Sequence, residues 1–91
     1  MISSNDIFDM MDFAENSLVA GNVKETAQAL EHLAALFGAI DDRQGFFNLR
    51  KSIIQSAMAK TNRAFIEEML EQVERERAND RGNTSRIIIP S

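Results

Sequence analysis

The sequence has no cysteine, tryptophan or tyrosine, and it has one histidine and one proline in 91 residues. The absence of cysteine excludes disulfides, thiolate metal sites and a cysteine nucleophile, and it is typical of proteins from a reducing compartment. His32 has no second histidine or cysteine with which to share a metal ion, and no nucleophile–base set can be assembled. Glycine-rich phosphate loops, dinucleotide fingerprints and calcium loops are also missing. We therefore expect a non-catalytic protein with no cofactor and no metal.

Long hydrophobic runs are also absent. Residues 1–12 are acidic and interrupted by polar side chains, so the sequence predicts neither a signal peptide nor a membrane-spanning helix. We expect a cytoplasmic protein. The hydrophobic fraction of 44% and the charged fraction of 26% are typical of a globular chain, and a chain of this length supports one domain.

The first half of the chain has the pattern of two helices. Polar residues at 3–5 can cap a helix that begins near residue 4, and Gly21 can end it in the left-handed conformation. Asn22 followed by Glu25 is typical of a capping box, so a second helix is predicted over 22–39. Because almost no loop joins the two helices, we expect an antiparallel hairpin. The apolar face of the first helix is formed by Ile7, Phe8, Met10, Met11, Phe13, Ala14 and Leu18.

A third helix is predicted over 43–78, since apolar residues recur there at helical spacing and 46–77 contain no glycine or proline. Asp41 or Asp42 would cap it, and Gly45 weakens its start, so that the helix could begin properly only at Phe46. A straight helix over 46–77 would span roughly 45–50 Å. Asn62 is a possible cap for a new helix, so two alternatives stay open. A straight helix would meet a second chain, and a bent one would fold back on its own domain.

The last residues differ in character from the rest. Polar, turn-forming residues at 79–85 predict that the third helix stops near residue 79. Three β-branched residues then precede the proline, and we expect a short extended apolar tail that docks on its own domain or on a neighbouring chain. The predicted organisation is a single helical domain over 1–79, followed by a polar turn and an apolar tail over 80–91.

Charge is distributed unevenly along the chain, whose net charge is −4. Residues 1–42 carry −7, residues 43–65 carry five basic residues and no acid, and residues 66–91 carry −2. One interpretation is charge complementarity between packed helices of the same chain. A second is that the basic band, defined as the five basic residues of 43–63, contacts phosphates. A third is an acidic surface that competes with nucleic acid for a basic target.

These patterns together predict an all-α fold in which an antiparallel helical hairpin packs on a long third helix, and they favour a homodimer joined through third helices or tails. The favoured function is a non-catalytic protein–protein interaction module, such as a small regulatory adaptor or inhibitor of a larger bacterial or phage protein machine. The alternative is a dimeric nucleic-acid-binding regulator that uses the basic band, and no membrane partner is expected. Candidate partner-binding residues are basic or apolar: Arg43, Arg50, Lys51, Lys60, Arg63, Phe65, Met69, Ile87, Ile88 and Ile89.

Overall fold

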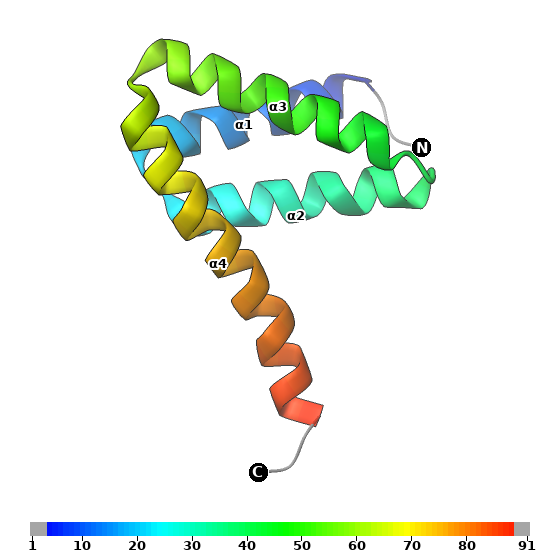
Figure 1. Ribbon diagram of the computed structural model, residues 1–91. Helices are drawn as coiled ribbons and strands as arrows, with labels where there is room; N and C mark the ends of the chain where they lie inside the picture. Colours follow the sequence, from blue (N-terminus) through cyan, green and yellow to red (C-terminus); the bar gives the residue numbers. More distant parts are fainter. Residues whose placement is uncertain (1–3, 89–91) are drawn as a thin grey trace.

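Four helices joined by short connections account for residues 4–88 (Figure 1). The computed structural model describes the backbone of these residues and the side chains of residues 6–79. The helices are α1 (Ser4–Ala20), α2 (Val23–Ala39), α3 (Arg43–Lys60) and α4 (Arg63–Ile88). No strand occurs within residues 4–88, so the predicted all-α class is confirmed.

The connection between α1 and α2 turns at Gly21. Its φ of +82° lies in the left-handed region that glycine adopts without steric cost. The Asn22 N–H donates to the Ser17 carbonyl (2.9 Å) and the Gly21 N–H donates to the Leu18 carbonyl (3.2 Å). This is the Schellman pattern of a helix end, and it brings α2 back alongside α1 (Figure 1). The predicted capping box is wrong, because the Asn22 side chain makes no cap bond and the Thr26 hydroxyl donates to the Asn22 carbonyl instead (2.8 Å).

The connection between α2 and α3 has the same hydrogen-bond pattern with an aspartate at the turn. Asp41 has a φ of +55°, and the Asp42 N–H donates to the Phe37 carbonyl (2.9 Å). Asp42 then caps α3, since its carboxylate accepts a hydrogen bond from the Gly45 N–H (2.9 Å). This cap explains why α3 begins at Arg43, although Gly45 predicts a later start.

The prediction of one long helix over 43–78 is wrong, because the helical conformation is interrupted at Thr61 and Asn62. Thr61 has φ −134° and ψ −126°, outside the helical region. Asn62 is the cap that one of the two alternatives required, because its Oδ1 accepts from the Phe65 N–H (2.7 Å). After this break α4 turns away from α3 and crosses α2 (Figure 1). The apolar seam of α4 is therefore buried within the same chain.

Each helix contacts the other three, and α2 makes the most extensive contacts, so it is the central element of the core. Its buried alanines, Ala27 and Ala29, allow neighbouring helices to approach closely. One core cluster draws on every helix: Ala14, Ala27, Ala29, Leu30, Leu33, Phe46, Leu49, Ile53 and Val73. A second cluster closes the end where α1 and α3 finish: Leu18, Ala57, Ile66 and Met69.

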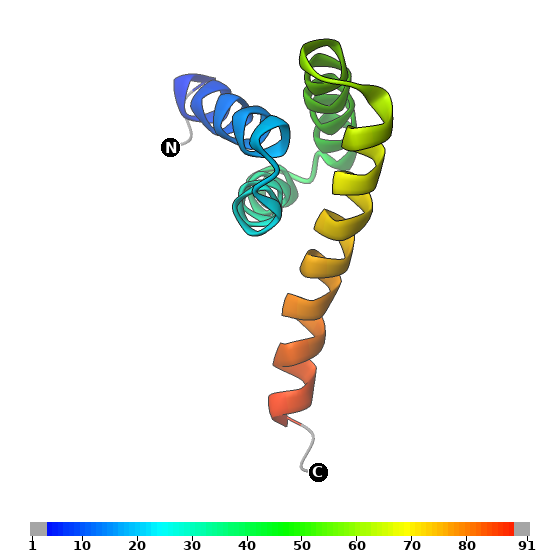
Figure 2. The same cartoon turned by 90° about the vertical axis from the view of Figure 1, so that its left-hand side faces the viewer.

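Helix α4 is longer than the sequence predicts. It continues to Ile88, so the backbone of residues 80–88 is helical where a polar turn and an extended tail are predicted. No proline interrupts this stretch, and a single glycine costs a helix only about 1 kcal/mol. The end of α4 extends away from the other three helices in both views (Figures 1 and 2). Ile89 and the two residues after it lie outside the described part of the chain. Among the helices of residues 4–88, none combines the length and low polarity needed to cross a bilayer.

Candidate functional site

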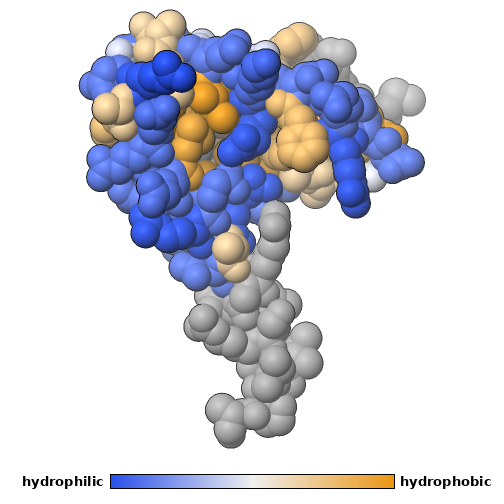
Figure 3. Space-filling model, viewed as in Figure 1, coloured by the Kyte–Doolittle hydropathy of each residue, from blue (hydrophilic) through white to orange (hydrophobic). Residues whose placement is uncertain are grey.

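A groove opens between the end of α2, the start of α3 and the middle of α4. Its volume is about 720 Å³, within the range of about 300–1,000 Å³ that is usual for binding pockets. It is lined by Ala34, Phe37, Gly38, Arg43, Phe46, Phe47, Arg50, Glu74 and Arg77. Figure 3 views the side on which α3 and α4 lie in front, and it shows apolar side chains gathered between hydrophilic ones.

Three phenylalanines form the apolar wall of the groove. Phe46 belongs to the core and is 8% exposed, Phe37 is half-buried, and Phe47 is 57% exposed. The ring centroids of Phe46 and Phe47 lie 6.0 Å apart with the rings tilted by 54°, a favourable aromatic arrangement. The exposed ring of Phe47 therefore adjoins the core, and its outer side faces solvent.

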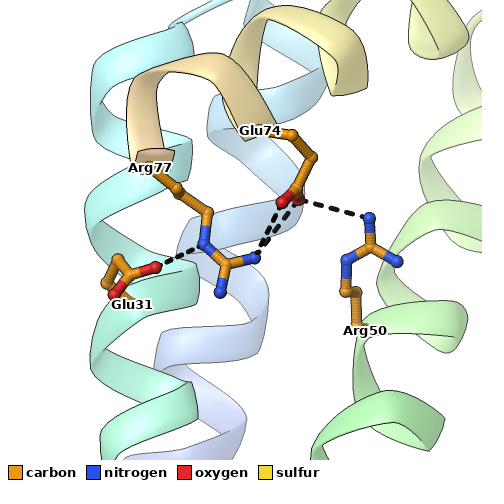
Figure 4. A network of polar contacts seen from close by, with 4 residues as sticks. All are labelled: Glu31, Arg50, Glu74 and Arg77. Carbon is orange, nitrogen blue, oxygen red and sulfur yellow. Dashed lines mark hydrogen bonds and ion pairs between the residues drawn. The ribbon is translucent and has the colours of Figure 1, made fainter. Parts of the chain in front are cut away.

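The charged wall of the groove is a network that links three helices (Figure 4). The Arg77 side chain is only 9% exposed, and its Nε donates to Glu31 of α2 (2.5 Å). Its Nη1 donates to Glu74 Oε2 (3.2 Å), and Arg50 of α3 donates from Nη2 to the same oxygen (3.2 Å). The Arg77 guanidinium carbon lies 5.8 Å from the centroid of the Phe46 ring, which adds a cation–π contact. The network therefore fixes α4 against α2 and α3.

Sequence reasoning missed the burial of Arg77. The periodicity contains a signal for it, because Arg77 follows Val73 by four residues and Ile66 by eleven on the stripe that faces the core. Both of those residues are fully buried at 0% exposure. The charge of arginine masks this signal, since charged side chains are rarely buried without a partner. Here the partners come from Glu31, a residue far away in the sequence, and from Glu74.

Two of the five basic candidates lie in the groove. Arg43 and Arg50 are both among its lining residues, and their spacing of seven residues places them on one face of α3 with Phe47 between them. Lys51 is exposed and lies outside the groove lining. Only part of the predicted basic band therefore lines the groove.

The other two basic candidates lie at the far end of α3 and the start of α4. Lys60 forms an ion pair with Glu15 of α1, and Arg63 pairs with Glu67 one turn along α4 (3.3 Å). The hydrogen bond from Lys60 lowers the pKa of Glu15, burial opposes this shift, and a hydrogen bond from Ser56 lowers the pKa further. Ion pairs of this kind fit the interpretation that the charge segments complement one another within the chain.

The apolar candidates are dispersed as well. Phe65 is half-buried and packs beside Gly21, where its Cζ lies 3.5 Å from the position a β-carbon would take. Met69 is 6% exposed and belongs to the second core cluster, so little of its surface is available to the predicted partner. Ile87 and Ile88 are in the helical backbone of α4 and their side chains lie outside the described residues, as does the whole of Ile89.

The site contains no recognisable metal centre. Within the described residues, no group of three or more His, Cys, Asp or Glu side chains is placed to hold a metal ion. Comparisons with protein-family models, curated protein sequences and solved structures found no match to this chain.

Proposed function

We propose that the chain is a non-catalytic protein–protein interaction module, such as a small regulatory adaptor or inhibitor, and that the groove is its binding surface. The observation that carries this proposal is Phe47, which is 57% exposed between Arg43 and Arg50 on one face of α3. Aromatic residues and arginine are the types most enriched where proteins bind one another. Covering a phenylalanine side chain contributes about 1.5–3 kcal/mol. We place this interaction in the cytoplasm, which fits the lack of cysteine.

The structural surroundings also favour binding at this face. Phe47 is supported by the core residue Phe46, so little side-chain freedom is lost when a partner covers it. Arg50 is held by Glu74, which orients its guanidinium at the groove before any partner arrives. Preorganised contacts of this kind give higher affinity for the same buried area.

The test is affinity capture from cells that express the tagged chain, with captured proteins quantified by mass spectrometry. Phe47→Ala should remove a specific captured protein, because the main apolar contact is lost. Phe8→Ala is the matched control, since Phe8 is equally exposed at 59% but lies on α1 outside the groove lining. Capture of no protein, or equal capture by both variants, would overturn the proposal.

The alternative function, nucleic-acid binding by the basic band, has one observation in its favour. Arg43 and Lys51 are exposed, and within residues 6–79 neither has an ion pair. The other three basic residues of the band are paired with acids of the same chain. A titration of duplex DNA binding against salt decides between the two functions, because phosphate contacts strengthen as salt is lowered. Undetectable binding at low salt would exclude the alternative.

A homodimer is a further part of the proposal. The bend at Asn62 lets α4 bury its seam in its own chain, so the dimer is not needed to cover that seam. The end of α4 nevertheless extends beyond the bundle (Figure 2) and presents a helix for a second copy. Light scattering should give about twice the monomer mass of 10.2 kDa at high micromolar concentration. The monomer mass under those conditions would refute the dimer.

A further inference from the structure

We propose that the groove binds an acidic segment of the partner protein, whose carboxylates contact Arg43 and Arg50 while an apolar side chain covers Phe47. This inference rests on the proposed protein-binding function and adds the chemistry of the partner. It follows from three properties of the groove: its local charge, the donors that its arginines leave unused, and the acids that surround it.

The groove has the opposite charge to the chain as a whole. Its charged lining residues are three arginines and one glutamate, a formal charge of +2, whereas the chain carries −4. At physiological ionic strength, charges more than about 8–10 Å apart are largely screened where solvent lies between them. An approaching segment is therefore attracted by Arg43 and Arg50, and acids beyond this distance oppose it little. The charge of Arg77 is offset by its ion pairs with Glu31 and Glu74.

Arg43 and Arg50 have guanidinium N–H groups that make no hydrogen bond within the described residues. In the described contacts Arg50 uses only Nη2, toward Glu74, and Arg43 makes no hydrogen bond or ion pair within residues 6–79. A guanidinium can donate two parallel hydrogen bonds to one carboxylate, which gives both strength and orientation. The seven-residue spacing of the two arginines is about two helical turns, roughly 10 Å. A partner helix that carries acids at similar spacing on either side of an apolar residue matches this arrangement.

The acids in and beside the groove favour the binding of a peptide with separate carboxylates over the binding of a nucleic-acid strand. Glu74 lies in the groove, and Asp41 and Asp42 directly precede Arg43 in the chain. A phosphate backbone presents closely spaced charges, so it would meet these acids as well as the arginines. A peptide can place its carboxylates only where the guanidinium groups lie. The groove is therefore selective for an acidic peptide segment.

The experiment uses the full chain and two pools of fluorescein-labelled helical peptides, each about four helical turns long. Both pools carry Leu or Phe at a central position. One pool has Asp and Glu on either side of that position, and the other has Asn and Gln there. Binding is measured by fluorescence anisotropy, and the site is mapped from amide chemical-shift changes. A labelled duplex DNA oligonucleotide forms a third arm.

We expect the acidic pool to bind at least about tenfold more tightly than the amide pool, because charge-assisted hydrogen bonds are about twice as strong as neutral ones. Arg43→Gln and Phe47→Ala should each weaken binding by about fivefold or more. Arg75→Gln is the matched control, since Arg75 is exposed on α4 outside the groove lining. It should leave the affinity for the acidic pool within about twofold of the wild type. Arg43 is exposed and makes no ion pair within residues 6–79, so its variant should also keep the wild-type melting temperature.

Equal binding of the two peptide pools would overturn the proposal, as would equal losses in the Arg43→Gln and Arg75→Gln variants. Tighter, Arg43-dependent binding of the DNA would replace it with the nucleic-acid function. Failure of the acidic pool alongside Phe47-dependent capture of a cellular protein would refute the partner chemistry and leave the proposed function standing. Failure of both would remove the groove as a binding site.

Discussion

The two ends of the helical bundle differ in the backbone conformation of their turn residues and in the burial of their charged side chains. At the groove end, Asp41 has a positive φ although it is not a glycine, and Arg77 is buried. At the opposite end, Gly21 occupies the equivalent turn position and the Arg63–Glu67 pair lies at the surface, while the Glu15 side chain is 13% exposed and is paired with Lys60. Costly features of this kind cluster at functional sites in many proteins. The comparison supports the placement of the proposed binding surface at the groove end.

The largest expected effect comes from Arg77→Ala. The variant removes the ion pairs of the buried Arg77 with Glu31 and Glu74 and its cation–π contact with Phe46. Breaking a buried pair costs about 3–5 kcal/mol, and because a third of the Glu31 side chain is exposed we expect a loss of about 2–4 kcal/mol. Urea denaturation measures the free energy of unfolding.

The control for that variant is Arg63→Ala at the opposite end. Arg63 is 79% exposed and Glu67 is 59% exposed, so this ion pair is solvated. We expect a change below about 0.5 kcal/mol. Equal free energies of unfolding for Arg77→Ala and Arg63→Ala would contradict the expectation that the buried Arg77 contacts contribute more to stability than the solvated Arg63–Glu67 pair.

The next largest effect is expected for Gly45→Ala. Alanine is the better helix former, but a β-carbon here would collide with the Asp42 carboxylate that caps α3 and would lie 2.9 Å from the Phe37 ring. We expect a loss of about 1–3 kcal/mol of unfolding free energy. Gly38→Ala is the matched control, since no atom lies within 4 Å of its β-carbon position. It should stabilise the protein by about 0.5–1 kcal/mol, measured by thermal unfolding.

Substitutions at the two turn residues, Asp41 and Gly21, test the steric cost of a β-carbon at positive φ in each turn. Asp41→Gly should stabilise the protein by about 0.5 kcal/mol, because glycine adopts a φ of +55° without the steric cost of a β-carbon. Gly21→Ala should destabilise it by about 1 kcal/mol because φ is +82°, although the added β-carbon would lie at an ordinary contact distance from the Phe65 ring (3.5 Å). Changes of the same sign in the two variants would contradict this account of the turns.

The smallest expected effect is the contribution of the Glu15–Lys60 pair to stability at acidic pH. The pKa of Glu15 is lowered in the folded protein by its hydrogen bond from Lys60, so folding favours the ionised carboxylate. Its stabilising contribution is present above the ordinary pKa of 4.5 and is lost as the pH falls through the lowered folded pKa. Glu15→Gln should therefore flatten the decline of stability below pH 4.5, measured by denaturation at a series of pH values. A variant curve parallel to that of the wild type would count against the pair.

Much of the fold could be predicted because helices are specified locally. The end of α1 at Gly21 and the caps Asp42 and Asn62 depend on side chains within a few residues of the bonds they make. The packing of exposed residues could not be predicted in this way. Phe8 and Phe13 belong to the apolar pattern of α1, yet they are 59% and 47% exposed, because the tertiary packing of the helices decides which apolar residues are covered.

The candidate site was predicted only in part. Arg43 and Arg50 were recognisable from the basic band, since residues 43–65 contain five basic residues and no acid. Phe47 and Glu74 were not, because nothing local distinguishes a groove residue from a core or surface one. Lys60, by contrast, belongs to the band but lies at the opposite end of α3, paired with Glu15.

The sequence by itself determined the helical state, the helix boundaries at Gly21 and Asp42, and the separation of charge along the chain, because each depends on near neighbours. The tertiary structure alone decided the direction of α4 after Asn62, the burial of Arg77 and the groove that follows from both. Arg77 and Glu31 are 46 residues apart in the chain. Their contact forms only once α4 has folded back over α2, and packing of the whole bundle selects that arrangement.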